Sequence, residues 1–261
     1  MHLAFPSVGA TENLMLAAAG SAGVTRIVNA AREPEIADLA RFLRAAGLSL
    51  RGEGSSVIHI EGRGRLRPTE YRILPDRIAS ATWASAAAAA GGELFLRGAV
   101  PDQISAVTSL LAGAGAELRE DRAGLFIRRT GAFSPAYAVR TMPYPGFPTD
   151  AQAILMATAL KGRGVSAFTE TIFESRFRHT AEMARMGADI RLFGRSALVF
   201  GREKLSGARV SAPDLRGGAA LILAALSAEG ESRIDGMHYV ERGYEDIAGT
   251  LASVGADVKP L

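Results

Sequence analysis

The 261-residue sequence contains no cysteine. This absence excludes disulfide bonds, thiolate nucleophiles and cysteine-ligated metal centres within the chain. Histidine is scarce as well, and the four residues His2, His59, His179 and His238 do not have the spacing of a metal-binding pair. We therefore expect no metal site, and nothing in the sequence indicates another cofactor.

Long apolar runs are also missing. No stretch approaches the roughly 18 uninterrupted apolar residues of a membrane span, so no contact with a membrane is expected. The first residues lack a basic segment followed by an apolar core, so we expect a cytoplasmic location. The net charge is +3, and scattered basic residues without interleaved aromatics favour a small anionic substrate over nucleic acid.

What the sequence does contain is a fourfold internal repeat. One set of glycines, each ending an amphipathic stretch, lies at intervals of 68, 72 and 68 residues: Gly47, Gly115, Gly187 and Gly255. A second set precedes short β-type runs at similar intervals: Gly23, Gly92, Gly164 and Gly230. Because the two registers agree and the period is longer than that of common solenoid repeats, each unit is predicted to be a small α/β module.

The units share one expected order of elements. An Ala-rich helix with few charges precedes a short strand, and an amphipathic helix and a hairpin follow. The Ala-rich helices are expected at 11–23, 77–92, 151–164 and 215–230. Nearly uncharged helices must be buried, so three units around a common axis would place these helices inside and the sheets outside. The predicted class is therefore α/β, with a domain boundary near Leu74 and Pro75.

Polar loops precede the buried helices. Ser7, Val8 and Gly9 precede the first helix, where free N–H groups suit a phosphate, although a simple cap and turn is the alternative. Three prolines in segment 143–150 fix the loop before Asp150 and direct its carboxylate, although a helix N-cap is the alternative there. Both functional interpretations stay open at this level.

Three arginines occupy similar edges of successive units. Arg176 follows a strand, Arg216 lies in the first turn of a helix, and Arg242 lies in a later loop. A cation in a first helical turn opposes the helix dipole by ~0.3–1 kcal/mol, and an anion bound beside Arg216 would remove this conflict. Single arginines are usually solvated, but three of them beside Asp150 favour a carboxylate or phosphate site.

Several stretches of the sequence resemble the enolpyruvyl transferases, and in particular the UDP-N-acetylglucosamine 1-carboxyvinyltransferase family. They follow one another in the family's order across residues 5–245: FPSVGATEN, NAAREPEI, LPDRI, PYPGFPTDAQA, ETIFESRF, RMGA, KLSGA, DLR and ERGYE. The strings PSVGATEN, AAREPEI and PGFPTD are the most specific of them. The sister family that acts on shikimate 3-phosphate shares the architecture but is not expected to have these strings.

The resemblance implies an inside-out α/β barrel of repeated units in two domains, with the active site in the cleft between them. It also implies a reaction: transfer of enolpyruvyl from phosphoenolpyruvate to the 3-hydroxyl of UDP-N-acetylglucosamine. This reaction is the first committed step of peptidoglycan synthesis.

The resemblance assigns reacting and charged groups to five positions. Asp150 binds the sugar hydroxyl and is a candidate general base, and Asp214 lies beside the reacting centre as a second candidate catalytic residue. Arg176, Arg216 and Arg242 hold the carboxylate and phosphate of the enolpyruvyl donor. These residue types fit the chemistry, because a carboxylate takes the hydroxyl proton and fixed cations stabilise the anions.

The remaining implied contacts involve substrate binding alone. Ser7, Val8 and Gly9 match the segment that contacts the diphosphate. Ile172 and Phe173 match residues that line the sugar and uracil side of the substrate.

The family's chain begins well before the position of Met1. This sequence has no counterpart of the family's early Lys-Asn pair, or of its mobile loop carrying a reactive Cys (or Asp) and an Arg. We therefore expect residues 1–75 to be the last repeat of a partial first domain. Residues 76–261 are expected to form a second domain of three repeats that lacks its N-terminal strand.

Two functional classes remain open. The chain is either a truncated or split transferase, with a separate N-terminal half chain as an expected partner, or a non-catalytic nucleotide-sugar-binding or regulatory protein derived from that enzyme.

Overall fold

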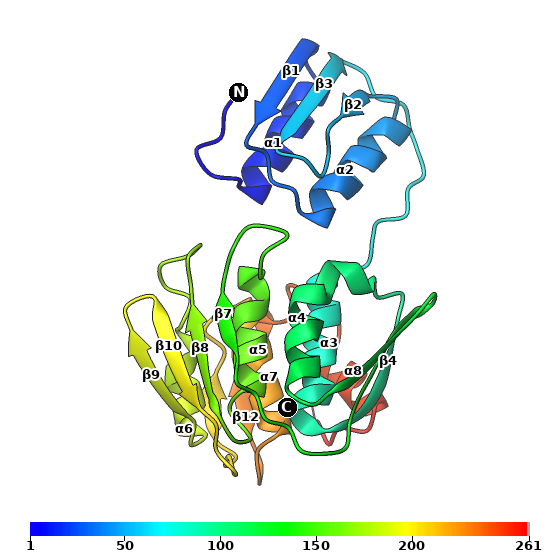
Figure 1. The fold of residues 1–261 in the computed structure, drawn as a ribbon. Helices are drawn as coiled ribbons and strands as arrows, with labels where there is room; N and C mark the ends of the chain where they lie inside the picture. Colours follow the sequence, from blue (N-terminus) through cyan, green and yellow to red (C-terminus); the bar gives the residue numbers. More distant parts are fainter. Residues whose placement is uncertain (260–261) are drawn as a thin grey trace. The chain divides into compact units, whose positions relative to one another are not determined.

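A computed structural model describes residues 1–259 of the protein (Figure 1). These residues divide into two compact units: unit one comprises Met1–Leu74 and Pro143–Gly146, and unit two comprises Pro75–Met142 and the residues from Phe147 onward. The expected division into 1–75 and 76–261 did not anticipate that Pro143–Gly146 belongs to unit one. Positions 260 and 261, which that division placed in the second domain, lie outside the described residues.

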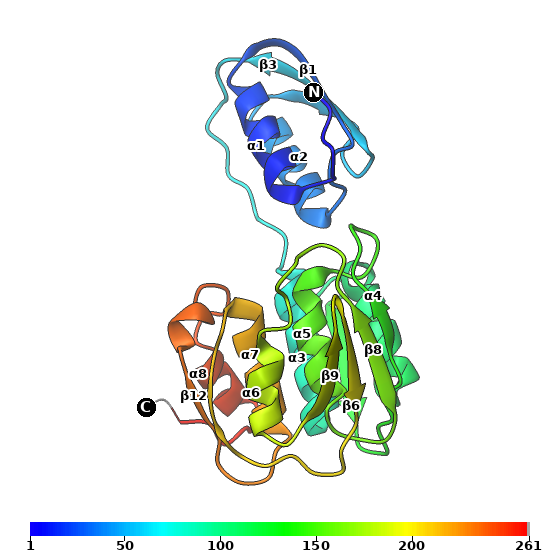
Figure 2. The ribbon, with the colours of Figure 1, turned by 90° about the vertical axis from the view of Figure 1, so that its left-hand side faces the viewer.

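Unit one is a single α/β module in which two helices pack against a three-stranded antiparallel sheet (Figure 2). Its elements are α1 (Val8–Ala19), β1 (Ala22–Val28), α2 (Pro34–Ala45), β2 (Ser49–Arg51) and β3 (Val57–Arg63), with the strand order β1-β3-β2. Alternate strand residues Ile27, Ile58 and Ile60 are buried with Met15 of α1 and Leu43 of α2. This burial of every second residue is what a half-buried strand requires.

Unit two contains three further modules. The first consists of α3 (Arg77–Ala90), β4 (Gly92–Arg97), α4 (Pro101–Gly113), β5 (Glu117–Asp121) and β6 (Gly124–Arg129), with the strand order β4-β6-β5. The second consists of β7 (Ala138–Arg140), the 3-10 turn η1 (Thr149–Ala151), α5 (Gln152–Thr158), β8 (Val165–Thr169), α6 (His179–Arg185), β9 (Asp189–Phe193) and β10 (Ser196–Phe200), with the strand order β7-β8-β10-β9. The third consists of β11 (Arg209–Ser211), α7 (Leu215–Leu226), β12 (Arg233–Asp235), the 3-10 turn η2 (Met237–Tyr239) and α8 (Ile247–Ser253).

The helices α3, α5 and α7 pack against one another in the middle of unit two, with the sheets on the outside (Figure 1). Every residue of α5 is buried, including Ile154, Leu155 and Met156. The mixed helix and strand content and the interior helices agree with the predicted class. In the described part of unit two the strands form three separate sheets, and no hydrogen bonds join them into one closed barrel.

The repeat glycines share one backbone conformation. The glycines that follow the second helix of each unit have φ between +89° and +112°: Gly47, Gly115, Gly187 and Gly255. Those of the other register also have positive φ: Gly23, Gly92, Gly164 and Gly230. Only glycine enters this region without strain, so the spacing seen in the sequence reflects a conformation that recurs in every unit.

All four Ala-rich helices end earlier than expected, α3 at Ala90 and α7 at Leu226. The helix expected at 11–23 begins three residues earlier because Ser7 caps it. It ends at Ala19, shortly before β1 begins at Ala22. The helix expected at 151–164 ends at Thr158, and Lys161 instead forms an isolated β-bridge with Arg202.

Some sheet edges in unit two are open. Strand β7 pairs in parallel with β8, and β11 pairs in parallel with β12. Among the described residues, β4 has no parallel strand on its free edge, where β8 has β7. Likewise, within residues 1–259, β12 has no antiparallel neighbour, where β8 has β10 and the β9–β10 hairpin. Unpaired edges expose backbone donors and acceptors that a further strand can satisfy.

Candidate functional site

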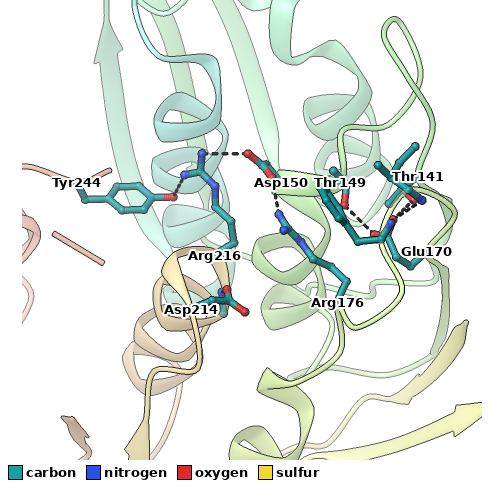
Figure 3. A network of polar contacts seen from close by, with 11 residues as sticks. Thr141, Thr149, Asp150, Glu170, Arg176, Asp214, Arg216 and Tyr244 are labelled. Carbon is teal, nitrogen blue, oxygen red and sulfur yellow. Dashed lines mark hydrogen bonds and ion pairs between the residues drawn. The ribbon is translucent and has the colours of Figure 1, made fainter. Parts of the chain in front are cut away.

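The carboxylate of Asp150 forms ion pairs with arginines from two modules of unit two. Asp150 lies in η1, and its two carboxylate oxygens accept hydrogen bonds from the Nη2 atoms of Arg176 and Arg216, the latter at 3.2 Å. Figure 3 shows the carboxylate between the two guanidinium groups. Neither η1 nor α5 has a side-chain cap, so the alternative interpretation of Asp150 as a helix cap is wrong.

The two arginines are largely buried and incompletely paired. Their side chains are 19% and 13% exposed for Arg176 and Arg216, whereas that of Asp150 is 39% exposed. The Nε atom of each guanidinium is buried and has no hydrogen-bond partner within the described residues. Since unsatisfied buried donors of charged groups are costly, a carboxylate or phosphate beside Asp150 would stabilise both.

Glu170 holds the loop that leads to Arg176. This carboxylate is buried, and its Oε1 accepts hydrogen bonds from Thr141 Oγ1 at 2.8 Å and from the N–H groups of Ile172 and Phe173 at 2.7 and 3.1 Å. Its Oε2 accepts from Thr149 Oγ1 at 2.8 Å. Because Thr149 is the neighbour of Asp150, Glu170 fixes the loop and the η1 turn to each other.

The two apolar candidates of this loop differ in exposure. Ile172 is half-buried, whereas Phe173 is exposed at 49%. The Cζ atom of Arg176 lies 5.0 Å from the centre of the Phe173 ring, a cation–π contact. Phe173 therefore offers a solvent-accessible aromatic surface next to the charged cluster.

Asp214 is the N-cap of α7. Its Oδ1 accepts a hydrogen bond from Gly217 N at 2.8 Å. Arg216, two residues further, lies in the first turn of the same helix, and its unfavourable position there is balanced by the negative charge of Asp150. The anion expected beside Arg216 is thus, in part, a side chain of the protein itself.

Arg242 is not drawn into this cluster. It is exposed and makes no hydrogen bond or ion pair with any residue between positions 1 and 259. Of the three expected arginines, Arg176 and Arg216 contact Asp150, and the role of Arg242 stays a prediction.

In unit one, Ser7 caps α1. Its Oγ accepts a hydrogen bond from Ala10 N at 3.3 Å. Val8 and Gly9 form the first turn of α1, where N–H groups have no intrahelical acceptor. Both the cap and a turn with available donors are therefore present at these three residues.

Comparison with known proteins identifies the family. The family model described as EPSP synthase (3-phosphoshikimate 1-carboxyvinyltransferase) matches residues 1–251. The chain belongs to the EPSP synthase family, which is a family of enzymes.

Its relatives within the EPSP synthase family include several UDP-N-acetylglucosamine 1-carboxyvinyltransferases. The chain is 45% identical to one from Caldanaerobacter subterraneus over 99% of its own length and 62% of the relative's. It is 48% identical to that of Gluconobacter oxydans over 98% and 61% of the two lengths. The chain thus spans about six tenths of the length of these relatives.

Two solved structures share the fold. The enolpyruvyl transferase NikO from Streptomyces tendae has a TM-score of 0.85 at 24% identity, with 98% of this chain and 61% of that one covered. EPSP synthase from Acinetobacter baumannii has a TM-score of 0.74 at 21% identity, covering 100% and 63%. The likeness confirms the mixed helix and strand architecture.

Two further residues of this family member adjoin the cluster and were not among the predicted site residues. Tyr244 is buried, and its Oη accepts a hydrogen bond from Arg216 Nη1 at 3.2 Å (Figure 3). His179 is buried, with Nε2 3.4 Å from the Sδ atom of Met156. The string ERGYE contains Tyr244, but a sequence does not show that its hydroxyl turns inward.

Burial dominates the chemistry of His179. Desolvation lowers its pKa from 6.5 to about 4, with a smaller opposing contribution from Asp214 and a further lowering by Arg176. The imidazole is therefore neutral at physiological pH. Among residues 1–259, no group of three or more His, Asp or Glu side chains is arranged to hold a metal ion, and no helix is long and apolar enough to cross a membrane.

Proposed function

We propose that this chain is part of an enzyme that transfers enolpyruvyl from phosphoenolpyruvate to the 3-hydroxyl of UDP-N-acetylglucosamine, a reaction of peptidoglycan synthesis in the cytoplasm. The observation that carries the proposal is the pair of buried guanidiniums that flank Asp150, each with an unpartnered Nε. The relatives named UDP-N-acetylglucosamine 1-carboxyvinyltransferase support the choice of acceptor.

In this proposal the charged residues of unit two act on the reacting groups. A bond forms between the sugar oxygen and the enolpyruvyl carbon, the bond from that carbon to the phosphate oxygen breaks, and inorganic phosphate leaves. Asp150 orients the hydroxyl and accepts its proton, with Asp214 beside the reacting centre. Arg176, Arg216 and Arg242 bind the donor's carboxylate and phosphate, whose charges fixed cations stabilise.

The other proposed contacts bind the nucleotide sugar. Ser7, Val8 and Gly9 at the start of α1 bind the diphosphate through backbone N–H groups. Ile172 and Phe173 contact the sugar and uracil side. Because Glu170 fixes both N–H groups of these two residues, their loop is preorganised for this contact.

We further propose that turnover needs the part of the relatives that this sequence does not span, supplied on the same polypeptide or by a separate N-terminal half chain. In this view residues 1–75 are the last repeat of one transferase domain, and residues from 76 onward form the second domain. The open edges of β4 and β12 are where missing strands would pair.

Phosphate release from phosphoenolpyruvate, with and without UDP-N-acetylglucosamine, tests both statements. The chain alone is expected to show negligible release. Adding the separately expressed N-terminal four tenths of the Gluconobacter oxydans relative should give release that depends on both substrates. Normal turnover by the chain alone, roughly 1–10³ per second, would contradict the need for the missing part.

Binding of UDP-N-acetylglucosamine by the complemented assembly without any phosphate release would overturn the proposed activity. That result would favour the non-catalytic binding protein instead. Phosphate release by the same assembly without UDP-N-acetylglucosamine is the control for contaminating phosphatase activity.

A further inference from the structure

A chain of hydroxyl groups leads away from Arg216 into the core of unit two. Arg216 Nη1 donates to Tyr244 Oη at 3.2 Å, and Tyr244 Oη lies 2.7 Å from Thr82 Oγ1. Thr82 Oγ1 in turn donates to the carbonyl oxygen of Ile78 at 2.8 Å. These contacts join the loop after η2 to α7 and α3, so they connect the third module of the unit with the first.

The direction of each hydrogen bond in this chain is determined. The guanidinium has donors only, so Tyr244 Oη accepts from Arg216. The Thr82 proton is used on the Ile78 carbonyl, so Thr82 Oγ1 accepts from Tyr244. Burial raises the pKa of Tyr244, so the phenol keeps the proton that it donates. The hydroxyls of Tyr244 and Thr82 are thus each both donor and acceptor.

The second module contains the same hydroxyl pair without an arginine. Tyr137 Oη lies 3.1 Å from Thr158 Oγ1, which donates to the Leu155 carbonyl oxygen at 2.8 Å. Both side chains are buried, and burial raises the pKa of Tyr137 to about 12. The two pairs are matched in residue type, burial and helix anchoring, and they differ in the cation that Tyr244 receives.

We propose that Tyr244 and Thr82 are positioning residues that hold the guanidinium of Arg216 against Asp150, beside the site of a bound anion. The role of that anion as the enolpyruvyl donor rests on the proposed function, whereas the positioning does not.

The geometry explains why such a device is needed. Arginine is a long side chain with many rotamers, and Arg216 starts from a helical turn whose dipole repels it. Two fixed points hold it, because Tyr244 binds Nη1 and Asp150 binds Nη2. The Arg216 Cζ atom also lies 5.8 Å from the centre of the Tyr244 ring. Both ends of the fork are thus engaged, while the buried Nε has no partner among the described residues.

The experiment compares Tyr244→Phe with Tyr137→Phe in the full 261-residue chain. Each variant removes one buried hydroxyl from a Tyr–Thr pair, so a purely structural role predicts similar losses of thermal stability. The distinguishing readout is the NMR signal of the Arg216 Nη protons, which is assigned by its loss in Arg216→Lys. Restricted rotation of a held guanidinium keeps these signals separate.

We expect separate Nη signals in the wild type and in Tyr137→Phe, and averaged signals in Tyr244→Phe. The Thr82→Val and Thr158→Val pair repeats the test with smaller changes, and it serves if Tyr244→Phe does not fold. Separate signals in a folded Tyr244→Phe or Thr82→Val, or averaged signals in the wild type, would overturn the proposal.

A second arm measures binding of phosphoenolpyruvate to the complemented assembly in the presence of UDP-N-acetylglucosamine. Loss of a hydrogen bond to a charged group predicts roughly tenfold weaker binding in Tyr244→Phe and no change in Tyr137→Phe. If the wild type binds no phosphoenolpyruvate while the Nη signals behave as expected, the proposed function fails and the positioning stands. If the Nη signals stay separate in Tyr244→Phe while the wild type binds phosphoenolpyruvate, the positioning fails and the proposed function stands.

Discussion

Three aspartates precede the three central helices of unit two, and they are used in two different ways. Asp76 Oδ1 accepts hydrogen bonds from Ile78 N at 2.7 Å and Ala79 N at 3.0 Å, which caps α3. Asp214 caps α7 in the same manner. Asp150 makes no hydrogen bond to its own helix and uses both oxygens on arginines from other parts of the chain.

A local change in the backbone explains the difference. In the second module the 3-10 turn η1 is inserted before α5, so that Asp150 lies inside a turn rather than one residue ahead of a helix. Thr149 is held by Glu170 through its side chain. The second module thus differs from the other two in its backbone, and its Asp150 carboxylate binds arginines instead of capping a helix. Such local differences between repeats are typical of functional positions.

Replacing Asp150 by asparagine tests this comparison most strongly. Asn keeps the shape of the side chain and its capping ability but removes the charge that two guanidiniums contact. In the complemented assembly we expect turnover to fall by roughly 10²–10³-fold, the cost typical of one catalytic electrostatic group. Phosphate release measures the effect.

The matched variant Asp76→Asn should retain its cap, because Asn and Asp are equivalent N-caps. Thermal unfolding of the Asp150 variant measures its structural cost separately, because removal of the charge leaves the largely buried Arg176 and Arg216 without their anion. Near-normal turnover in Asp150→Asn would remove the distinction between Asp150 and its two sisters.

The repeat can be predicted from the sequence because the features that define it are local. Positive-φ glycines and an Asp before an apolar helix leave direct marks in the string of residues, as at Gly47 and Asp76. The use of Asp150 is not local, because its partners lie 26 and 66 residues further along the chain. The local sequence pattern alone therefore favoured the cap over the functional role of this residue, and both interpretations stayed open.

Other parts of the site could not be predicted for related reasons. Arg242 matches a family motif as well as Arg216 does, yet it is exposed, whereas the nearby Tyr244 turns inward to Arg216. His179 looked like an isolated histidine without ligand spacing. Its burial depends on the packing of Met156 from its own module and of Gly217 from the third module, which no local pattern reports.

The pH dependence of stability tests the buried surroundings of Asp214, which differ from those of Asp76 and Asp150. His179 adjoins Asp214 and Arg176, and its folded-state pKa is depressed to about 4 from 6.5. A depressed pKa means that the unfolded state binds the proton first, so stability is lost as pH falls from 6.5 through about 4. At 1.36 kcal/mol per pKa unit, the loss is roughly 3 kcal/mol.

Denaturant unfolding at several pH values measures this loss. The His179→Gln variant should show a flatter dependence between pH 6.5 and 4, because Gln does not titrate. His238→Gln, which removes an exposed imidazole, is the matched control. An identical slope in wild type and His179→Gln would mean that other groups cause the acid sensitivity.

The smallest expected effect separates capping from chemistry at Asp76 and Asp214. Alanine at either position removes the side-chain acceptor of a helix N-cap and should lower the free energy of unfolding by about 1 kcal/mol, and asparagine should restore most of it. Asp214 is also a proposed catalytic residue, so Asp214→Asn should recover stability without recovering turnover in the complemented assembly. Chemical unfolding and phosphate release on the same four variants measure the two properties separately. If Asp214→Asn restores both of them, Asp214 is a cap like Asp76, and Asp150 is left as the one aspartate of the three with a role beyond its helix.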